Sequence, residues 1–133
     1  MNPVHISRGA VQEISAHAQE ALPSECCGVL IGSGSAIVEA RRTRNLAESR
    51  TRFEVDPKGH IDARREARLR GLEVVGFYHS HPHSEPIPSD TDLAEASYPD
   101  SFHLIVQPLP ERATLRLFRL DGARFIEFEL VVD

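Results

Sequence analysis

Residues 72 to 83 read Leu72-Glu73-Val74-Val75-Gly76-Phe77-Tyr78-His79-Ser80-His81-Pro82-His83. The first eight residues of this stretch are largely apolar on both alternating faces, which is typical of a strand buried in the middle of a sheet. Prolines at positions 82, 86 and 88 predict a stiff loop immediately afterwards. We therefore expect a central strand whose C-terminal end carries His79 and His81.

Helix and strand signals lie on both sides of this strand. Ser7 can cap a helix that Pro23 stops, and Asp56-Pro57 opens a second helix that Gly71 ends. Further strands are expected at residues 4–6, 27–31, 36–38, 53–55, 102–106, 114–120 and 124–132, and a short helix from Ser89 to about Ser97. This pattern predicts a mixed α/β fold in which helices flank a mixed, curved sheet.

Length and composition favour one domain over residues 1–133. Domains typically contain about 100 to 150 residues, so two separate cores would each be marginal. Hydrophobic residues make up 41% of the chain and charged residues 26%, a balance that argues against intrinsic disorder. No apolar run approaches the roughly 18 to 20 residues of a membrane helix, and the polar N-terminus does not resemble a signal peptide. We expect a cytoplasmic protein without a membrane partner.

The charge is unevenly distributed. Fifteen basic and twenty acidic residues give a net charge of −5, which disfavours general nucleic-acid binding. Residues 41–70 nevertheless carry a net charge of +5, so this stretch either attracts an acidic partner or is simply a solvated face. The only cysteines, Cys26 and Cys27, are neighbours in sequence, and this does not indicate a disulfide scaffold.

Two histidines at the end of the central strand can chelate one metal ion. Side chains two residues apart in a strand point the same way, so His79 and His81 are about 6 to 7 Å apart along the chain. Asp92 follows the candidate helix cap Ser89 by three residues, so both side chains can face one pocket. Two histidines and one aspartate leave a fourth tetrahedral position for water, as in a catalytic rather than a structural zinc site.

Each half of this pattern has an ordinary explanation of its own. A His-x-His pair at a strand end is often only a polar feature of the surface, and Ser89-Asp90-Thr91-Asp92 alone is often only a helix cap. In combination and at this spacing, average residue usage predicts them by chance in roughly one chain per million. The combination therefore favours a metal site.

The pattern His79-Ser80-His81-Pro82, six residues, Ser89, two residues, Asp92 resembles the signature of the JAMM (MPN+) metalloprotease family. The segment from Pro23 to Gly32 resembles the part of bacterial stand-alone members that carries an upstream glutamate, here Glu25. The resemblance extends over nearly the whole chain and implies the cytidine-deaminase-like MPN/JAMM fold. It also implies three zinc ligands, namely His79, His81 and Asp92. By the same resemblance Glu25 is the general acid/base, and Ser89 is a hydrogen-bond donor to the oxyanion.

By this resemblance the chain is a zinc metallopeptidase or isopeptidase with one zinc ion. The implied reaction is hydrolysis, by a zinc-activated water, of the bond after the C-terminal Gly-Gly of a ubiquitin-like sulfur-carrier protein. The alternative is a non-catalytic scaffold or binding module of the same fold, but such members characteristically lack a ligand or the glutamate. Cell-wall peptide hydrolysis is disfavoured because no export signal is visible.

Three smaller expectations concern the surroundings of the site. A free edge on the strand that ends in His79 and His81, facing the loop 82–88, would form a narrow groove for an extended glycine-rich tail. His83 is expected beside the ligands or on the surface rather than among them. Cys26 and Cys27 are expected to be small residues at the edge of the core rather than a redox switch.

Overall fold

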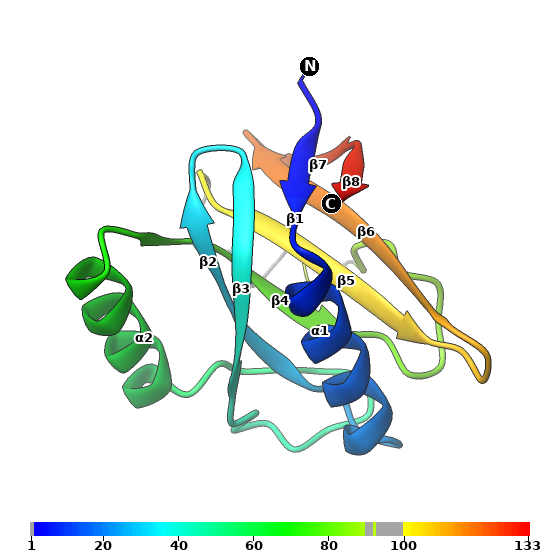
Figure 1. The fold of residues 1–133 in the computed structure, drawn as a ribbon. Coiled ribbons are helices and arrows are strands. Elements are labelled where there is room, and N and C mark those ends of the chain that lie inside the picture. The colour runs from blue at the N-terminus through cyan, green and yellow to red at the C-terminus, as the bar shows by residue number, and fades with distance from the viewer. Residues whose placement is uncertain (1, 90–91, 93–99) are drawn as a thin grey trace.

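The computed structural model describes residues 2–89, 92 and 100–133, in which two helices lie against one curved sheet (Figure 1). The helices are α1 (Arg8–Ala21) and α2 (Pro57–Leu69). The strands are β1 (Val4–Ile6), β2 (Cys27–Ser33), β3 (Ala36–Thr43), β4 (Glu73–Ser80), β5 (Phe102–Pro108), β6 (Ala113–Asp121), β7 (Arg124–Phe128) and β8 (Leu130–Val132). None of the helices in this part of the chain is long and apolar enough to cross a bilayer.

The sheet is mixed, with strand order β7-β6-β5-β4-β2-β3-β1-β8. β4 lies at its centre, antiparallel to β2 and parallel to β5, and every residue of β4 after Glu73 is buried. β7 and β8 lie at opposite ends of the order, yet only Glu129 separates them in sequence. The sheet must therefore curl until its two edges approach each other, which confirms the expected curved, mixed architecture.

The two helices cover opposite faces of the sheet. The inner face of α1 consists of Ala10, Ile14 and Ala18, which belong to the larger hydrophobic core. The buried face of α2 consists of Ala63 and Ala67, which belong to a second apolar cluster. Alternation along β2 connects the two clusters, since Leu30 belongs to the first and both Val29 and Ile31 to the second.

The helix boundaries follow the expected caps. The Ser7 side chain accepts a hydrogen bond from the Ala10 N–H, and the Asp56 side chain accepts one from the Lys58 N–H. Each cap satisfies an amide that has no partner within its helix. Gly71, two residues after the end of α2, has a φ of +72°, a left-handed conformation that glycine adopts without strain.

Two expected strands are wrong in part. The stretch 124–132 forms two strands, because the Val4 N–H donates to the Glu129 carbonyl and the following residues pair with β1 instead of β6. The stretch 53–55 forms no strand, and its only ladder contact is an isolated bridge between Asn45 and Val55. The expected short helix at 89–97 lies outside the described residues, except at Ser89 and Asp92.

Candidate metal centre

The candidate site begins where β4 leaves the sheet. His79 is paired with Cys27 of β2 and with Ile105 of β5, and the His81 N–H donates to the Val106 carbonyl at 2.9 Å. Hydrogen bonds with the neighbouring strands therefore fix the backbone as far as His81. Both histidines are almost completely buried, with 3% and 4% of their surface exposed.

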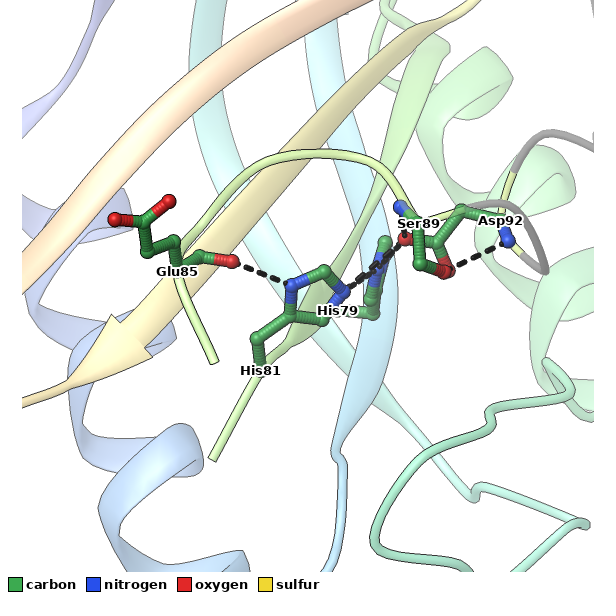
Figure 2. A network of polar contacts seen from close by, with 5 residues as sticks. All are labelled: His79, His81, Glu85, Ser89 and Asp92. Atoms are coloured by element: carbon green, nitrogen blue, oxygen red, sulfur yellow. Dashed lines mark hydrogen bonds and ion pairs between the residues drawn. The ribbon is translucent and has the colours of Figure 1, made fainter. Parts of the chain in front are cut away.

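Three side-chain atoms converge in front of this strand end (Figure 2). The two Nε2 atoms of His79 and His81 are 3.1 Å apart, and Asp92 Oδ2 lies 3.3 Å from the first and 3.1 Å from the second. A tetrahedral zinc ion with bonds of about 2.0 to 2.1 Å needs ligand atoms roughly 3.3 Å apart. The triangle has the dimensions and the nitrogen and oxygen donors that a metal ion requires.

The backbone of the following loop orients His81. Its Nδ1–H donates to the Glu85 carbonyl at 2.8 Å, so a metal ion that displaces the Nε2 proton would meet a lone pair directed at the common point. Figure 2 shows that the Glu85 carboxylate is directed away from the imidazoles and that only its carbonyl makes this contact. A neutral imidazole held in this tautomer is suited to metal ligation.

The imidazole of His79 is held by the aromatic ring of Phe53. Phe53 stacks on His79 with a centroid distance of 4.1 Å and an interplanar angle of 15°. Sequence reasoning assigned Phe53 to a strand and did not connect it with the site. No sequence signal could have made that connection, because the contact joins a loop and a strand 26 positions apart.

Ser89 and Asp92 hold each other in place. The Asp92 N–H donates to Ser89 Oγ at 3.0 Å, and the Ser89 N–H donates to Asp92 Oδ2 at 2.9 Å. The oxygen that faces the two imidazoles is thus fixed by a backbone amide, and the Ser89 hydroxyl proton remains available for donation. The spacing of three residues therefore brings Ser89 and Asp92 into direct contact with each other.

The electrostatics favour an ionised carboxylate. Burial would raise the pKa of Asp92, but its hydrogen bonds with His79 and His81 outweigh burial and hold that pKa well below its ordinary value. Burial lowers the pKa of His79. Burial acts in the same direction on His81, but hydrogen bonds with Asp92 and the Glu85 carbonyl raise its pKa overall. The site therefore combines an anionic oxygen with two imidazole nitrogens.

Glu25 lies beside this centre because β2 and β4 are antiparallel. Continuing the pairing of Cys27 with His79 by two residues brings Glu25 opposite His81, and hydrogen bonds between Cys26 and Ser80 support this register. Only 5% of the Glu25 surface is exposed. Its charge is the smallest of the influences that raise the pKa of His81.

The remaining candidates lie outside the cluster. His83 is exposed and is not among the converging atoms. Cys26 and Cys27 are buried free thiols at the start of β2, and Cys27 Sγ lies 3.5 Å from Thr43 Oγ1. Their burial agrees with the expected place at the edge of the core.

The expected free edge of the central strand is wrong. β4 is paired along both sides, with β2 on one and β5 on the other, and the His81 amide is also engaged. No extended tail can add to this strand, because the neighbouring strands already use its backbone groups. The sequence pattern marked a buried strand, and burial on both faces is the property of an interior strand.

Comparison with known proteins identifies the class. A profile described as prokaryotic homologs of the JAB domain matches residues 7–121. Desampylase from Haloferax volcanii is 38% identical over 110 residues, covering 77% of this chain and 79% of that protein. CysO-cysteine peptidase from Mycobacterium tuberculosis is 36% identical over 117 residues, covering 85% of this chain and 80% of that protein. The crystal structure of a JAB1/MPN domain protein from Archaeoglobus fulgidus matches with a TM-score of 0.63 at 25% identity, covering 98% and 99%.

The chain belongs to the prokaryotic JAB family, the JAMM/MPN+ type that its motif resembles. Its fold is the fold of that family, and it is a hydrolase of the JAMM isopeptidase type.

Proposed function

We propose that residues 1–133 act as one JAMM domain that uses zinc to cleave the bond after the C-terminal Gly-Gly of a ubiquitin-like sulfur-carrier protein. The convergence of His79 Nε2, His81 Nε2 and Asp92 Oδ2 within 3.3 Å of one another carries this proposal. A scaffold has no need for three ligand atoms that converge in this way.

His79, His81 and Asp92 would hold the zinc ion. When bound, zinc supplies a water whose pKa is lowered to about 7 and a Lewis acid for the substrate carbonyl. The protein keeps this donor set rigid through Phe53 stacked on His79 and the Glu85 carbonyl bonded to His81. A rigid donor set reduces the reorganisation that binding and reaction would otherwise require.

Glu25 would act as the general acid/base. Its carboxylate accepts the proton of the attacking water and delivers it to the leaving amine, two transfers that need one group beside the reacting carbonyl. Glu25 is buried and lies two residues before Cys27, the partner of His79 in β4, which supports this role.

Ser89 would donate its hydroxyl proton to the oxyanion that develops on the substrate carbonyl. Its Oγ already accepts from the Asp92 N–H, which fixes the oxygen while leaving the proton free to turn toward substrate. A donor fixed in advance stabilises the transition state more than the ground state.

The relatives point to the substrate class. One is a desampylase and another a CysO-cysteine peptidase, so both names describe the release of a group joined to another protein or amino acid. We infer that this chain likewise removes an appended residue or a conjugated protein from a small carrier protein. Glycines before the cut would allow the tail to pass between the loops that surround the buried centre.

The basic stretch 41–70 would contribute less to carrier binding than its charge suggests. Ion pairs with carboxylates among the described residues already engage at least five of its ten cationic groups, namely Arg41, Arg42, Arg44, Lys58 and Arg70. Arg65 and Arg68 on α2 form no ion pair with a described carboxylate. These two arginines are the stronger candidates for contact with an acidic carrier surface.

The test is incubation of zinc-loaded protein with carrier proteins extended beyond Gly-Gly by one residue or by an isopeptide-linked peptide. Intact-mass measurement should show release of the extension and a carrier that ends in Gly-Gly. Chelation should abolish the release and added zinc should restore it. Stable zinc binding without cleavage of any extended carrier would favour the binding module instead.

A further inference from the structure

Asn45 has an unusually complete set of hydrogen bonds for a loop side chain. Its Nδ2 group donates to the Glu25 carbonyl at 3.0 Å and to the Arg52 carbonyl at 3.2 Å. Its Oδ1 accepts from the Ala47 N–H at 3.0 Å and the Glu54 N–H at 2.8 Å. All four hydrogen-bonding positions of the amide are therefore used.

One of these bonds reaches Glu25 directly, and the same loop makes a second bond to its backbone. The Asn45 side chain binds the Glu25 carbonyl, and the Glu25 N–H donates to the Ser49 carbonyl at 2.7 Å. Both backbone groups of Glu25 are thus held by the loop that runs from Asn45 to Val55. β2 begins at Cys27, so hydrogen bonds from this loop hold the backbone of Glu25 just before the strand ladder starts.

The same loop also contacts a residue of the metal centre. Phe53 lies between Arg52 and Glu54, whose backbone groups both bind Asn45, and its ring stacks on His79. One side chain therefore ties together the backbone that carries the carboxylate and the ring that rests on an imidazole. Loss of Asn45 would release both at once, while the converging atoms of His79, His81 and Asp92 are held by other contacts.

We propose that Asn45 is a positioning residue that sets the carboxylate of Glu25 relative to the metal ligands. Its side chain does so by joining the backbone of the loop 45–55 to the backbone of Glu25, a contact called the closure below. This inference rests on the proposed function for its kinetic consequence, but the closure itself is independent of activity. A displacement of about 1 Å in a reacting group can cost on the order of 100-fold in rate. The expected effect of releasing Glu25 therefore falls on turnover and not on substrate binding.

The experiment compares three variants of the full chain. Asn45→Ala removes all four hydrogen bonds. Asn45→Asp keeps the oxygen that accepts from Ala47 and Glu54, and it replaces the donor group with a carboxylate oxygen that repels the Glu25 and Arg52 carbonyls. It therefore remains informative where Asn45→Ala fails to fold. Ser49→Ala is the matched control, because it removes a side-chain bond to the Thr51 N–H in the same loop and leaves the Ser49 carbonyl on Glu25.

Four quantities are measured: kcat, KM, bound zinc per chain, and the hydrogen-exchange rate of the Glu25 amide. In both Asn45 variants kcat should fall by about 10-fold to 100-fold while KM changes by less than about 3-fold. Zinc content should stay at one per chain, and the Glu25 amide should exchange at least about 10-fold faster. Ser49→Ala should resemble the wild type in all four.

The proposal is overturned if the Asn45 variants keep kcat within about 3-fold of Ser49→Ala. It is also overturned if both variants lose zinc or unfold at the assay temperature, since Asn45 would then support the fold in general. An inactive wild type would refute the proposed function alone, and the exchange rate would still decide the closure. Unchanged exchange of the Glu25 amide in Asn45→Ala would then overturn it.

Discussion

Replacing Glu25 with glutamine should separate proton transfer from metal binding. Glutamine has nearly the same size, and both backbone groups of Glu25 are already engaged by Ser49 and Asn45, so the substitution leaves the local backbone in place. The neutral amide cannot accept a proton from water. Zinc should remain bound, because the converging donor atoms belong to His79, His81 and Asp92.

The structure places the expected loss in the upper half of the usual range. A positioned acid/base contributes about 10²-fold to 10⁴-fold, which corresponds to roughly 2.7 to 5.4 kcal/mol of activation free energy. Asp92 is a poor substitute, since hydrogen bonds hold its pKa low and its Oδ2 also accepts from the Ser89 amide. The Glu85 carboxylate is exposed and directed away from the imidazoles. We therefore expect kcat to fall by about 10³-fold to 10⁴-fold.

The assay is single-turnover cleavage of an extended carrier followed by intact mass, with zinc measured in the same samples. Glu85→Gln is the matched control, because it makes the same chemical change on the neighbouring loop and preserves the carbonyl that binds His81. The control should keep nearly full activity. Near-normal turnover of Glu25→Gln with zinc bound would refute the assignment of Glu25.

Four further outcomes follow from the site. Asp92→Ala should lose zinc and all activity, because it removes one of three converging ligands; a variant that keeps one zinc per chain on metal analysis would contradict this. Ser89→Ala should lower kcat by about 10²-fold with little change in KM, and melting measured alongside separates this from the loss of a helix cap, worth about 1 kcal/mol; a large melting shift with unchanged kcat would leave only the cap. Carriers with Gly→Ala at either position before the cut should be cleaved much more slowly, and salt should weaken cleavage if arginines contribute; equal cleavage of both tails would exclude a narrow path. Burial raises the pKa of Cys26 to about 11 and that of Cys27 to about 12, so alkylation of the native protein at pH 8 should be slow and rise about 10-fold per pH unit; rapid modification seen by intact mass would show that the thiols are accessible.

The sequence predicted most elements because their signals are local. Caps at Ser7 and Asp56 and the apolar run of β4 depend on a few neighbouring residues. The division of 124–132 into two strands was not predictable, since alternation continues through Glu129 while the pairing partner changes from β6 to β1. A change of partner is set by the curvature of the whole sheet and leaves no mark on the local pattern.

The candidate site divides along the same line. His79, His81 and Asp92 could be proposed from spacing, because a strand end and a helix cap place them together by local geometry. Glu25 lies 54 positions before His79 and was found only through family resemblance. The sequence could not predict the contacts of Asn45 and of the Glu85 carbonyl. The first joins residues that are 20 positions apart, and the second does not use the Glu85 side chain.

The placement of Glu25 depends finally on how closely β2 packs against its neighbours. Gly28 pairs with Tyr78 across β2 and β4, and a Cβ at Gly28 would lie 2.3 Å from Tyr78 Cε2 and 2.4 Å from the Arg41 carbonyl oxygen. Real side chains do not approach so closely, so glycine is required for the three strands to lie together at this point. The antiparallel register that this packing permits brings Cys27 opposite His79, two residues after Glu25. The geometry of the centre is therefore set by a residue with no side chain as well as by the residues that would carry the chemistry.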